Sequence, residues 1–144
     1  MILVDANLLL YAYNRSAAQH ERARRWLELT LSGRDPVRLA WATVLAFLRI
    51  GTHPQAFERP LGVEEARDVV GEWFRTPAVA ILDPGERHWQ ILGELLVAVG
   101  ARGPLVSDAH LAALAIEHGA VLQTTDRDFA RFPGLRFVNP LTAK

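Results

Sequence analysis

The chain opens on three consecutive apolar residues, Ile2, Leu3 and Val4, and an acidic residue, Asp5, follows them at once. A short continuous apolar run predicts a strand that is buried on both faces, because neither side presents a polar residue to water. Such strands belong to parallel sheets that helices cover on both faces. An acid directly after this strand is expected at the carboxyl edge of the sheet, where open α/β sheets bind their ligands.

Strand-like and helix-like segments alternate along the rest of the chain. Further strands are expected at residues 37–40, 78–82, 120–124 and 135–138. Helical spacing of apolar residues marks 23–31, 63–74 and 89–99, and Ser107 is expected to cap a helix that stops at Gly119. We therefore predict one α/β domain over residues 1–144, with a parallel sheet of about five strands sandwiched between helices.

Composition excludes several classes of site. The 144 residues contain no cysteine, so disulfides, thiolate metal sites and cysteine nucleophiles are absent. The only lysine is Lys144, which excludes Schiff-base and P-loop chemistry at internal positions. Net charge is zero, so a polyanion would have to be held by a local patch. The absence of a signal peptide and of any apolar run of ~20 residues predicts a soluble cytoplasmic protein without membrane association.

Residues 41–51 form a helical pattern that is apolar in more than one direction. Leu45 and Leu48 fill one side, while Phe47 and Ile50 make other directions apolar too. A helix of this kind is buried or covered by another molecule.

Four acids share one predicted position. Asp5 follows the first strand, Asp126 and Asp128 follow the strand that ends at Thr124, and Asp108 opens the helix that leads into that strand. A crossover helix runs antiparallel to the strands, so its first residues return to the carboxyl edge. Three chain segments are thus expected to deliver four carboxylates to one edge of the sheet.

Each of these acids also has a purely structural explanation. Asp5 could accept hydrogen bonds from the amides of the next helix, and Asp108 is favourable near a helix N-terminus. Asp126 is an acceptable N-cap, with Asp128 in the first turn. Together, however, crowded carboxylates repel and raise one another's pKa, which a bound cation relieves. Oxygen ligands without a histidine cluster favour Mg²⁺ or Mn²⁺.

A magnesium site made of acids suits hydrolysis of phosphodiesters. The ion lowers the pKa of a water, holds a phosphate oxygen and neutralises charge in the transition state. Acyl transfer is disfavoured, because no serine lies in a nucleophile elbow. Receiver domains and haloacid-dehalogenase-type phosphatases are excluded, because Asp5 lacks a second acid beside it and the required lysine is missing.

Three stretches of the chain resemble PIN-domain ribonucleases: residues 4–12 (VDANLLLYA), the Asp108-Ala109 pair, and residues 124–129 (TTDRDF). The length and residues 41–54 are similar to the VapC toxins of toxin–antitoxin pairs. This resemblance implies Mg²⁺- or Mn²⁺-dependent RNA cleavage, with the family's acidic positions at Asp5, Asp108, Asp126 and Asp128. It also implies polar positions near the metal site, at Asn7 and at Thr124 or Thr125.

The resemblance further implies a homodimer and a small VapB-like antitoxin whose C-terminal segment covers the site. Arg15 or Arg127 is expected near the edge, where an arginine would orient phosphates. The sequence carries no base-reading signature that names the RNA.

One position departs from the family pattern. Phe47 stands where the family usually places a glutamate, and no acid occurs from residue 37 to residue 56. Phe47 either fills core volume or forms the apolar floor of the site or of an adjoining antitoxin groove. The four aspartates still suffice for one metal ion. The alternative function is a PIN-like domain that binds RNA or a protein but cleaves weakly.

Overall fold

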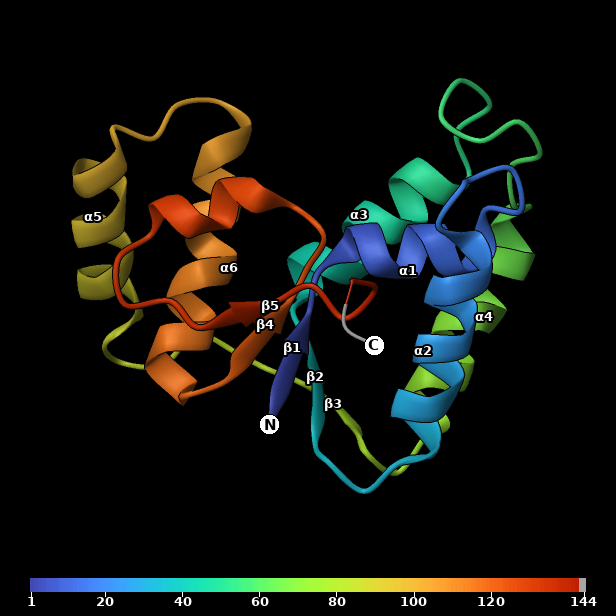
Figure 1. Cartoon of the computed structure of the whole chain (residues 1–144), viewed down its shortest axis with the longest axis horizontal. Coiled ribbons are helices and arrows are strands. Elements are labelled where there is room, and N and C mark those ends of the chain that lie inside the picture. Colours follow the sequence, from blue (N-terminus) through green and yellow to red (C-terminus); the bar gives the residue numbers. More distant parts are fainter. Residues whose placement is uncertain (143–144) are drawn as a thin grey trace.

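The computed structural model describes residues 1–142, and within them five parallel strands form one sheet (Figure 1). The strands are β1 (Ile2–Val4), β2 (Val37–Leu39), β3 (Val79–Ile81), β4 (Val121–Gln123) and β5 (Phe137–Val138). Their spatial order is β3-β2-β1-β4-β5, and every neighbouring pair is parallel. The first strand therefore lies at the centre, and both β2 and β4 pair with it.

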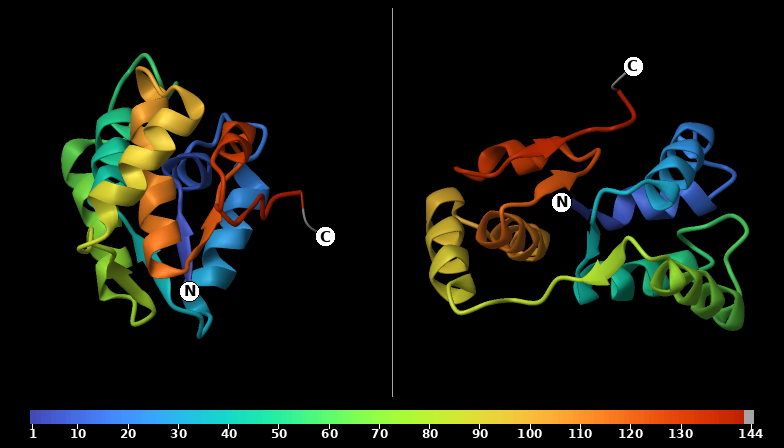
Figure 2. Two further views of the ribbon diagram at one scale, coloured as in Figure 1. Left: turned by 90° about the vertical axis from the view of Figure 1, so that its left-hand side faces the viewer. Right: turned by 90° about the horizontal axis from the view of Figure 1, so that it is seen from below.

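Helices cover both faces of this sheet, as the alternating sequence pattern predicts. They are α1 (Ala6–Tyr13), α2 (His20–Ser32), α3 (Trp41–Gly51), α4 (Val63–Arg75), α5 (His88–Val99), α6 (Pro104–His118) and the 3₁₀ turn η1 (Arg127–Arg131). Helices α1 to α4 gather on one side, while α5 and α6 lie on the other (Figures 1 and 2). The predicted sandwich of about five strands is confirmed.

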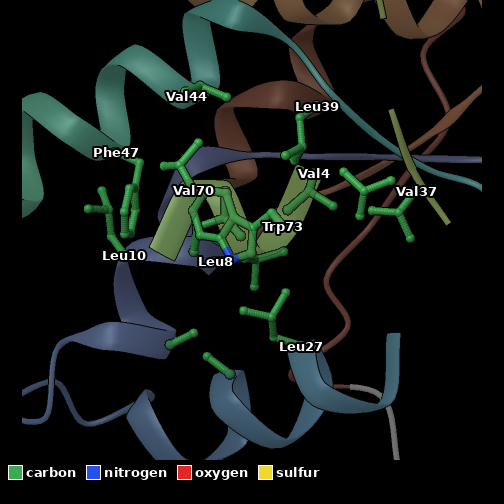
Figure 3. Packing of buried hydrophobic residues seen from close by; sticks show 14 of the residues in the cluster. Val4, Leu8, Leu10, Leu27, Val37, Leu39, Val44, Phe47, Val70 and Trp73 are labelled. Atoms are coloured by element: carbon green, nitrogen blue, oxygen red, sulfur yellow. The ribbon is translucent and has the colours of Figure 1, made fainter. Parts of the chain in front are cut away.

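Two hydrophobic clusters fill the two layers. Val4 packs with residues of α1 to α4 in one cluster (Figure 3), and Leu3 packs with residues of α5 and α6 in the other. Consecutive residues of a strand point to opposite faces of the sheet, and both side chains are fully buried because helices cover each face. The opening apolar run is therefore a central strand with no polar face.

Helix α6 begins earlier than the sequence predicts. Ser107 is not its cap: the helix starts at Pro104, after Gly103 with a φ of 57°. Proline at the first helical position has φ already fixed for the helix and lacks only an amide that would be unbonded there. Asp108 consequently lies in the second turn of α6 rather than opening it. The predicted stop at Gly119, whose φ is 66°, is confirmed.

Helix α3 is buried on one side only. Val44, Phe47 and Gly51 face the core, whereas Trp41 and Leu45 are 53% and 61% exposed. Of the two predicted alternatives for this helix, complete burial by the chain itself is therefore excluded. Cover by another molecule remains a prediction. In the described part of the chain, none of the helices has the length and apolar character needed to cross a membrane.

Candidate metal-binding active site

The acid that follows β1 is held at the junction between that strand and α1. The backbone N–H of Asp5 donates to the carbonyl of Gln123 at 3.0 Å, which extends the pairing of β1 with β4 by one residue. Asp5 occupies the N-cap position of α1, but its carboxylate makes no capping hydrogen bond to the described residues 1–142. Its side chain remains available for another partner.

That partner is Thr124, the residue that follows β4. The Thr124 hydroxyl donates to Asp5 Oδ2 at 2.7 Å, and Thr124 is almost completely buried. The same hydroxyl oxygen accepts the backbone N–H of Asp126 at 3.0 Å. One side chain thus joins the acid at the end of β1 to the loop that carries the acids after β4.

The loop after β4 is a short capped turn. Asp126 Oδ1 accepts the backbone N–H of Asp128 at 2.9 Å. Asp126 is therefore the N-cap of η1, and this part of the sequence interpretation is confirmed. Asp126 is half-buried and Asp128 is exposed. The hydrogen bond fixes one carboxylate oxygen of Asp126 and leaves the other unconstrained by the cap.

Asp108 has the most perturbed carboxyl group of the four. Burial and then repulsion from Asp126, Asp5 and Asp128 raise its pKa to about 6. Three separate chain segments therefore bring negative charge to the same place. A carboxyl with this pKa is partly protonated near neutral pH, which is the expected state of a crowded acid site that holds no cation.

Asp5 responds to the same surroundings. Burial raises its pKa, although the Thr124 hydrogen bond and the nearby amides of Ala6 and Asn7 favour the charged form. Repulsion from Asp126 adds to the rise. The hydrogen bonds that orient Asp5 do not fully compensate for its burial, so positive charge nearby would stabilise its carboxylate.

The donor set fits a hard divalent cation, but the side-chain positions are not those of a closed metal site. Carboxylate oxygens are the ligands that Mg²⁺ and Mn²⁺ prefer, and the raised pKa of Asp108 reflects uncompensated negative charge. Within residues 1–142, however, no three acidic or histidine side chains are grouped closely enough to hold one ion. Binding would therefore require the carboxylates to rotate toward one another.

The side chains of the other polar residues that the sequence assigns to the site make no hydrogen bond to the four acids among residues 1–142. Asn7 and Thr125 are half-buried, Asn7 in the first turn of α1 and Thr125 directly after Thr124. Arg127 is exposed and stands between Asp126 and Asp128. Arg15 follows α1 and lines a hollow of about 600 Å³ between α1, α2 and the segment before α4. Its expected place near the acids is wrong, because the whole of α1 separates it from Asp5.

Phe47 fills core volume, which is the first of its two predicted roles. The other role, as the apolar floor of the site or of an adjoining antitoxin groove, is wrong, because a floor must be accessible. It is fully buried among core residues that include Trp73 (Figure 3). Its ring meets Tyr13 and Trp73 edge-on at centroid distances of 5.6 and 4.7 Å. Val44, Phe47 and Gly51 are spaced by three and four residues, which places them on one helical face. That spacing was the available signal for burial.

A second polar cluster was not anticipated from the sequence. The Glu117 side chain is only 6% exposed and accepts the backbone N–H groups of Gly85 and Arg87 at 2.8 and 3.0 Å, just before α5. His88 Nε2 and His110 Nδ1 are 3.0 Å apart, and His88 Nδ1 has no hydrogen-bond partner in the described residues. The feature of the sequence that belongs to this cluster is Gly85, because a Cβ at that position would collide with the Glu117 carboxylate.

The fold is a parallel α/β sandwich, and acids from three chain segments follow its central strands or lie in the second turn of α6. The PIN domain model matches residues 2–135, and the chain belongs to the PIN-domain family.

Two related proteins are similar in sequence to this chain over nearly its whole length. Ribonuclease VapC37 of Mycobacterium tuberculosis is 46% identical over 140 residues, which is 97% of each protein. Ribonuclease VapC33 of the same species is 39% identical over 141 residues, covering 98% of this chain and 99% of that protein.

Solved structures share the fold at low sequence identity. VapBC2 from Rickettsia felis, bound to a promoter DNA fragment, superposes with a TM-score of 0.68 at 22% identity, covering 96% of this chain and 98% of that one. VapC20 of Mycobacterium tuberculosis, described as a sarcin-ricin loop cleaving toxin, has a TM-score of 0.67 at 18% identity, with 94% and 99% covered. At these identities the likeness shows the fold alone.

Proposed function

We propose that the protein is a Mg²⁺- or Mn²⁺-dependent endoribonuclease and the toxin of a VapBC-type toxin–antitoxin pair. The observation that carries this proposal is the gathering of Asp5, Asp108, Asp126 and Asp128, whose mutual repulsion helps raise the pKa of Asp108 to about 6. Full-length similarity to proteins named ribonucleases, at 46% and 39% identity, supports the substrate class.

These four aspartates would hold the metal through carboxylate oxygens. When bound, the ion would lower the pKa of a water and neutralise charge on the scissile phosphodiester. The reaction is hydrolysis: water oxygen bonds to phosphorus in line with the 3′-oxygen, whose bond to phosphorus breaks. The expected products therefore carry 5′-phosphate and 3′-hydroxyl ends.

The chain's own residues have separate tasks in this reaction. Thr124 holds Asp5 by its 2.7 Å hydrogen bond, so one oxygen of the carboxylate is fixed and the other can turn toward the site. Asp126 is fixed in the same way by the amide of Asp128. Arg127 is exposed between these acids and would contact a phosphate of the RNA.

The proposed partners follow from the same assignment. RNA is the substrate, and a small VapB-like antitoxin would bind over the site, since solved structures with this fold include VapBC complexes. We also propose that the active protein is a homodimer. An enzyme that cleaves cellular RNA and is held by such an antitoxin would act in the cytoplasm.

A second candidate is a PIN-like domain that binds RNA or protein but cleaves weakly. It is favoured by the carboxylate positions, since in residues 1–142 no three are grouped to hold one ion. It is also favoured by Phe47, which supplies no ligand from α3.

Metal binding and cleavage should be measured on the same protein. Calorimetry with Mn²⁺ and cleavage of a mixed RNA pool with and without EDTA separate the two candidates. The nuclease should bind Mn²⁺ and lose cleavage in EDTA. Asp5→Asn should abolish both, while Asp68→Asn, which alters an exposed aspartate on α4, should change neither. Metal binding without cleavage would favour the weak module, and 2′,3′-cyclic phosphate ends would contradict the hydrolytic route.

A further inference from the structure

Charged residues are distributed unevenly around the acid site. From residue 95 to residue 144 the chain carries four arginines, and its only acid outside the site is Glu117. By contrast, the residues that follow β1 and β2, at 6–14 and 40–48, include no charged residue. Strand β1 lies between β2 and β4 in the sheet. The acids are therefore flanked by uncharged chain on the β2 side and by arginines on the β4 side.

The turn η1 leads from the acids to the end of α5. It is fixed by Phe129 and Phe132, which lie in the same buried cluster as Leu95 of α5. At the end of the turn, Arg131 Nη2 donates to the carbonyl of Val99, the last residue of α5, at 3.5 Å. Figure 1 shows η1 crossing α6 toward α5. Since a 3₁₀ helix rises about 2 Å per residue, Arg131 stands roughly 8 Å along the turn from its first residue.

Arg102 continues the same line of positive charge. It is exposed and lies three residues after Val99, in the connection between α5 and α6. Helix α6 begins two residues later at Pro104 and advances about 6 Å before it reaches Asp108, at about 1.5 Å per residue. The backbone of Arg102 therefore lies just beyond the start of the helix that carries this acid. We refer to three residues together as the arginine strip: Arg127, Arg131 and Arg102.

The guanidinium groups of the arginine strip do not neutralise the acids. Among the ion pairs of residues 1–142, none involves an arginine of the strip. The charges that shift the pKa of Asp108 are those of Asp126, Asp5 and Asp128, and all three raise it. A guanidinium among the acids would lower that pKa. The strip thus lies beside the acid site, and its positive charge is available to a ligand.

We propose that Arg131 and Arg102 bind RNA phosphates next to the one that is cleaved, so that the strand runs from the acids over η1. This inference rests on the proposed nuclease function. Guanidinium groups bind phosphate oxygens through paired hydrogen bonds, and such contacts position a nucleic acid without reading its bases. The uncharged β2 side offers a phosphate no such partner, so the path of the strand is one-sided.

RNA fits the arginine strip better than an acidic protein segment does. A phosphodiester held at the acids is always followed by further phosphates of the same strand, which must lie beside the site whatever the sequence of the RNA. The strip meets those phosphates where they leave the acids. The net charge of the chain is zero, so this local surface supplies the attraction that the whole molecule lacks.

Binding should be measured by fluorescence anisotropy with a short fluorescein-labelled single-stranded RNA of random sequence, with Ca²⁺ replacing Mg²⁺. The variants are Arg102→Gln, Arg131→Gln, the two glutamine changes combined, and Arg102→Lys combined with Arg131→Lys. Arg25→Gln, which alters an exposed arginine on α2, is the matched control. Each protein is titrated at several salt concentrations, because every phosphate contact releases counterions and adds to the salt dependence of binding.

Each single glutamine variant should bind RNA about 2- to 5-fold more weakly at low salt, as expected for loss of one exposed ion pair. The slope of log affinity against log salt should become shallower by ~0.7 for each arginine lost, and by ~1.4 in the combined variant. The lysine variant keeps both charges and should keep the slope. Arg25→Gln should match the unaltered protein.

Cleavage and stability separate a contact with RNA from a structural role. With Mg²⁺, the combined glutamine variant should show a raised KM with little change in kcat. Its thermal unfolding should match that of the unaltered protein, since both side chains are exposed.

Several results would overturn the inference. Unchanged affinity and salt slope in the combined glutamine variant would exclude the arginine strip from RNA binding, and an equal loss in Arg25→Gln would show that only total charge matters. Altered sedimentation with unchanged RNA affinity would assign the strip to a protein interface. If the unaltered protein neither binds nor cleaves RNA, the proposed function fails along with this inference, whereas a failure confined to these variants leaves that function standing.

Discussion

The hydroxyl of Thr124 donates a 2.7 Å hydrogen bond to the carboxylate of Asp5, joining the ends of the two central strands β4 and β1. The hydroxyl oxygen also accepts the amide of Asp126. Because Thr124 is buried, water cannot easily replace it in either bond. The relative positions of the first and third acids therefore depend on one side chain.

Replacing Thr124 should weaken metal binding without removing a proposed ligand. Thr124→Val keeps the shape but loses both hydrogen bonds, so Asp5 and Asp126 lose their common anchor. Mn²⁺ affinity measured by calorimetry should fall about 10- to 100-fold, as for other residues that orient metal ligands. Thr124→Ser, which keeps the hydroxyl, should recover most of the loss. Equal affinity of the Val and unaltered proteins would contradict this role.

Asp108 should make the metal-free protein less stable as pH rises. Its folded pKa of about 6 exceeds the unfolded value, so the folded state binds the proton more tightly. Stability associated with this group is therefore full below about pH 4 and is lost as pH rises through about 6. Since Asp108 is half-exposed, the effect after solvent screening is on the order of 1 kcal/mol.

Asp108→Asn tests this linkage directly. In EDTA at pH 7 the variant should be more stable than the unaltered protein, and the difference should shrink toward pH 4. Urea unfolding at several pH values measures it, with Asp68→Asn as the control for loss of an exposed carboxylate. A variant that is less stable at pH 7 would show that Asp108 supports the fold rather than straining it.

Phe47 should tolerate no charge. Its ring packs against Tyr13 and Trp73 and has no exposure, so Phe47→Glu buries a carboxylate without a cation beside it. The expected loss is several kcal/mol of unfolding free energy, enough to unfold a domain of this size. Phe47→Leu should remain folded, with a loss of about 1 kcal/mol for an altered apolar shape. Thermal unfolding followed by circular dichroism compares them.

A folded Phe47→Glu protein that binds Mn²⁺ more tightly would contradict this placement. That result would mean that residue 47 reaches the metal site and that the glutamate missing from the family pattern can be restored. The buried position predicts the opposite, since the core face of α3 also carries Val44 and Gly51.

Much of this architecture is readable from local sequence pattern. The run Ile2 to Val4 predicts the central strand because a strand buried on both faces must be apolar throughout. The start of α6 was misplaced because Ser107 resembles a cap, while Pro104 after Gly103 is the actual start. Both signals were present in the chain, and the proline signal is the stronger.

The contacts between side chains are less accessible to sequence reasoning. The strand directions predict that Asp5, Asp108 and Asp126 lie near one another, and the repulsion that helps raise the pKa of Asp108 agrees with this prediction. The Thr124 to Asp5 bond depends on the side-chain conformations that β1 and β4 allow, which no periodicity specifies. The side of α3 that meets the core is set by the packing of α1 and α4 against it.

Glu117 gives the last prediction, because a carboxylate at the end of α6 holds the segment before α5. Burial opposes its charge, but the amides of Gly85 and Arg87 and the nearby His118 and His88 outweigh it and lower its pKa. A lowered folded pKa contributes stability above the unfolded value of about 4.5, which is lost as pH falls through the folded pKa.

Glu117→Gln should therefore cost about 1–3 kcal/mol at pH 7, as expected for weakened charged hydrogen bonds. Urea unfolding measures this loss, which should shrink below pH 4, and Glu94→Gln on the exposed face of α5 should leave stability unchanged. Equal stability of the Glu117→Gln and unaltered proteins at pH 7 would show that the negative charge of Glu117 does not strengthen its hydrogen bonds to the two amides.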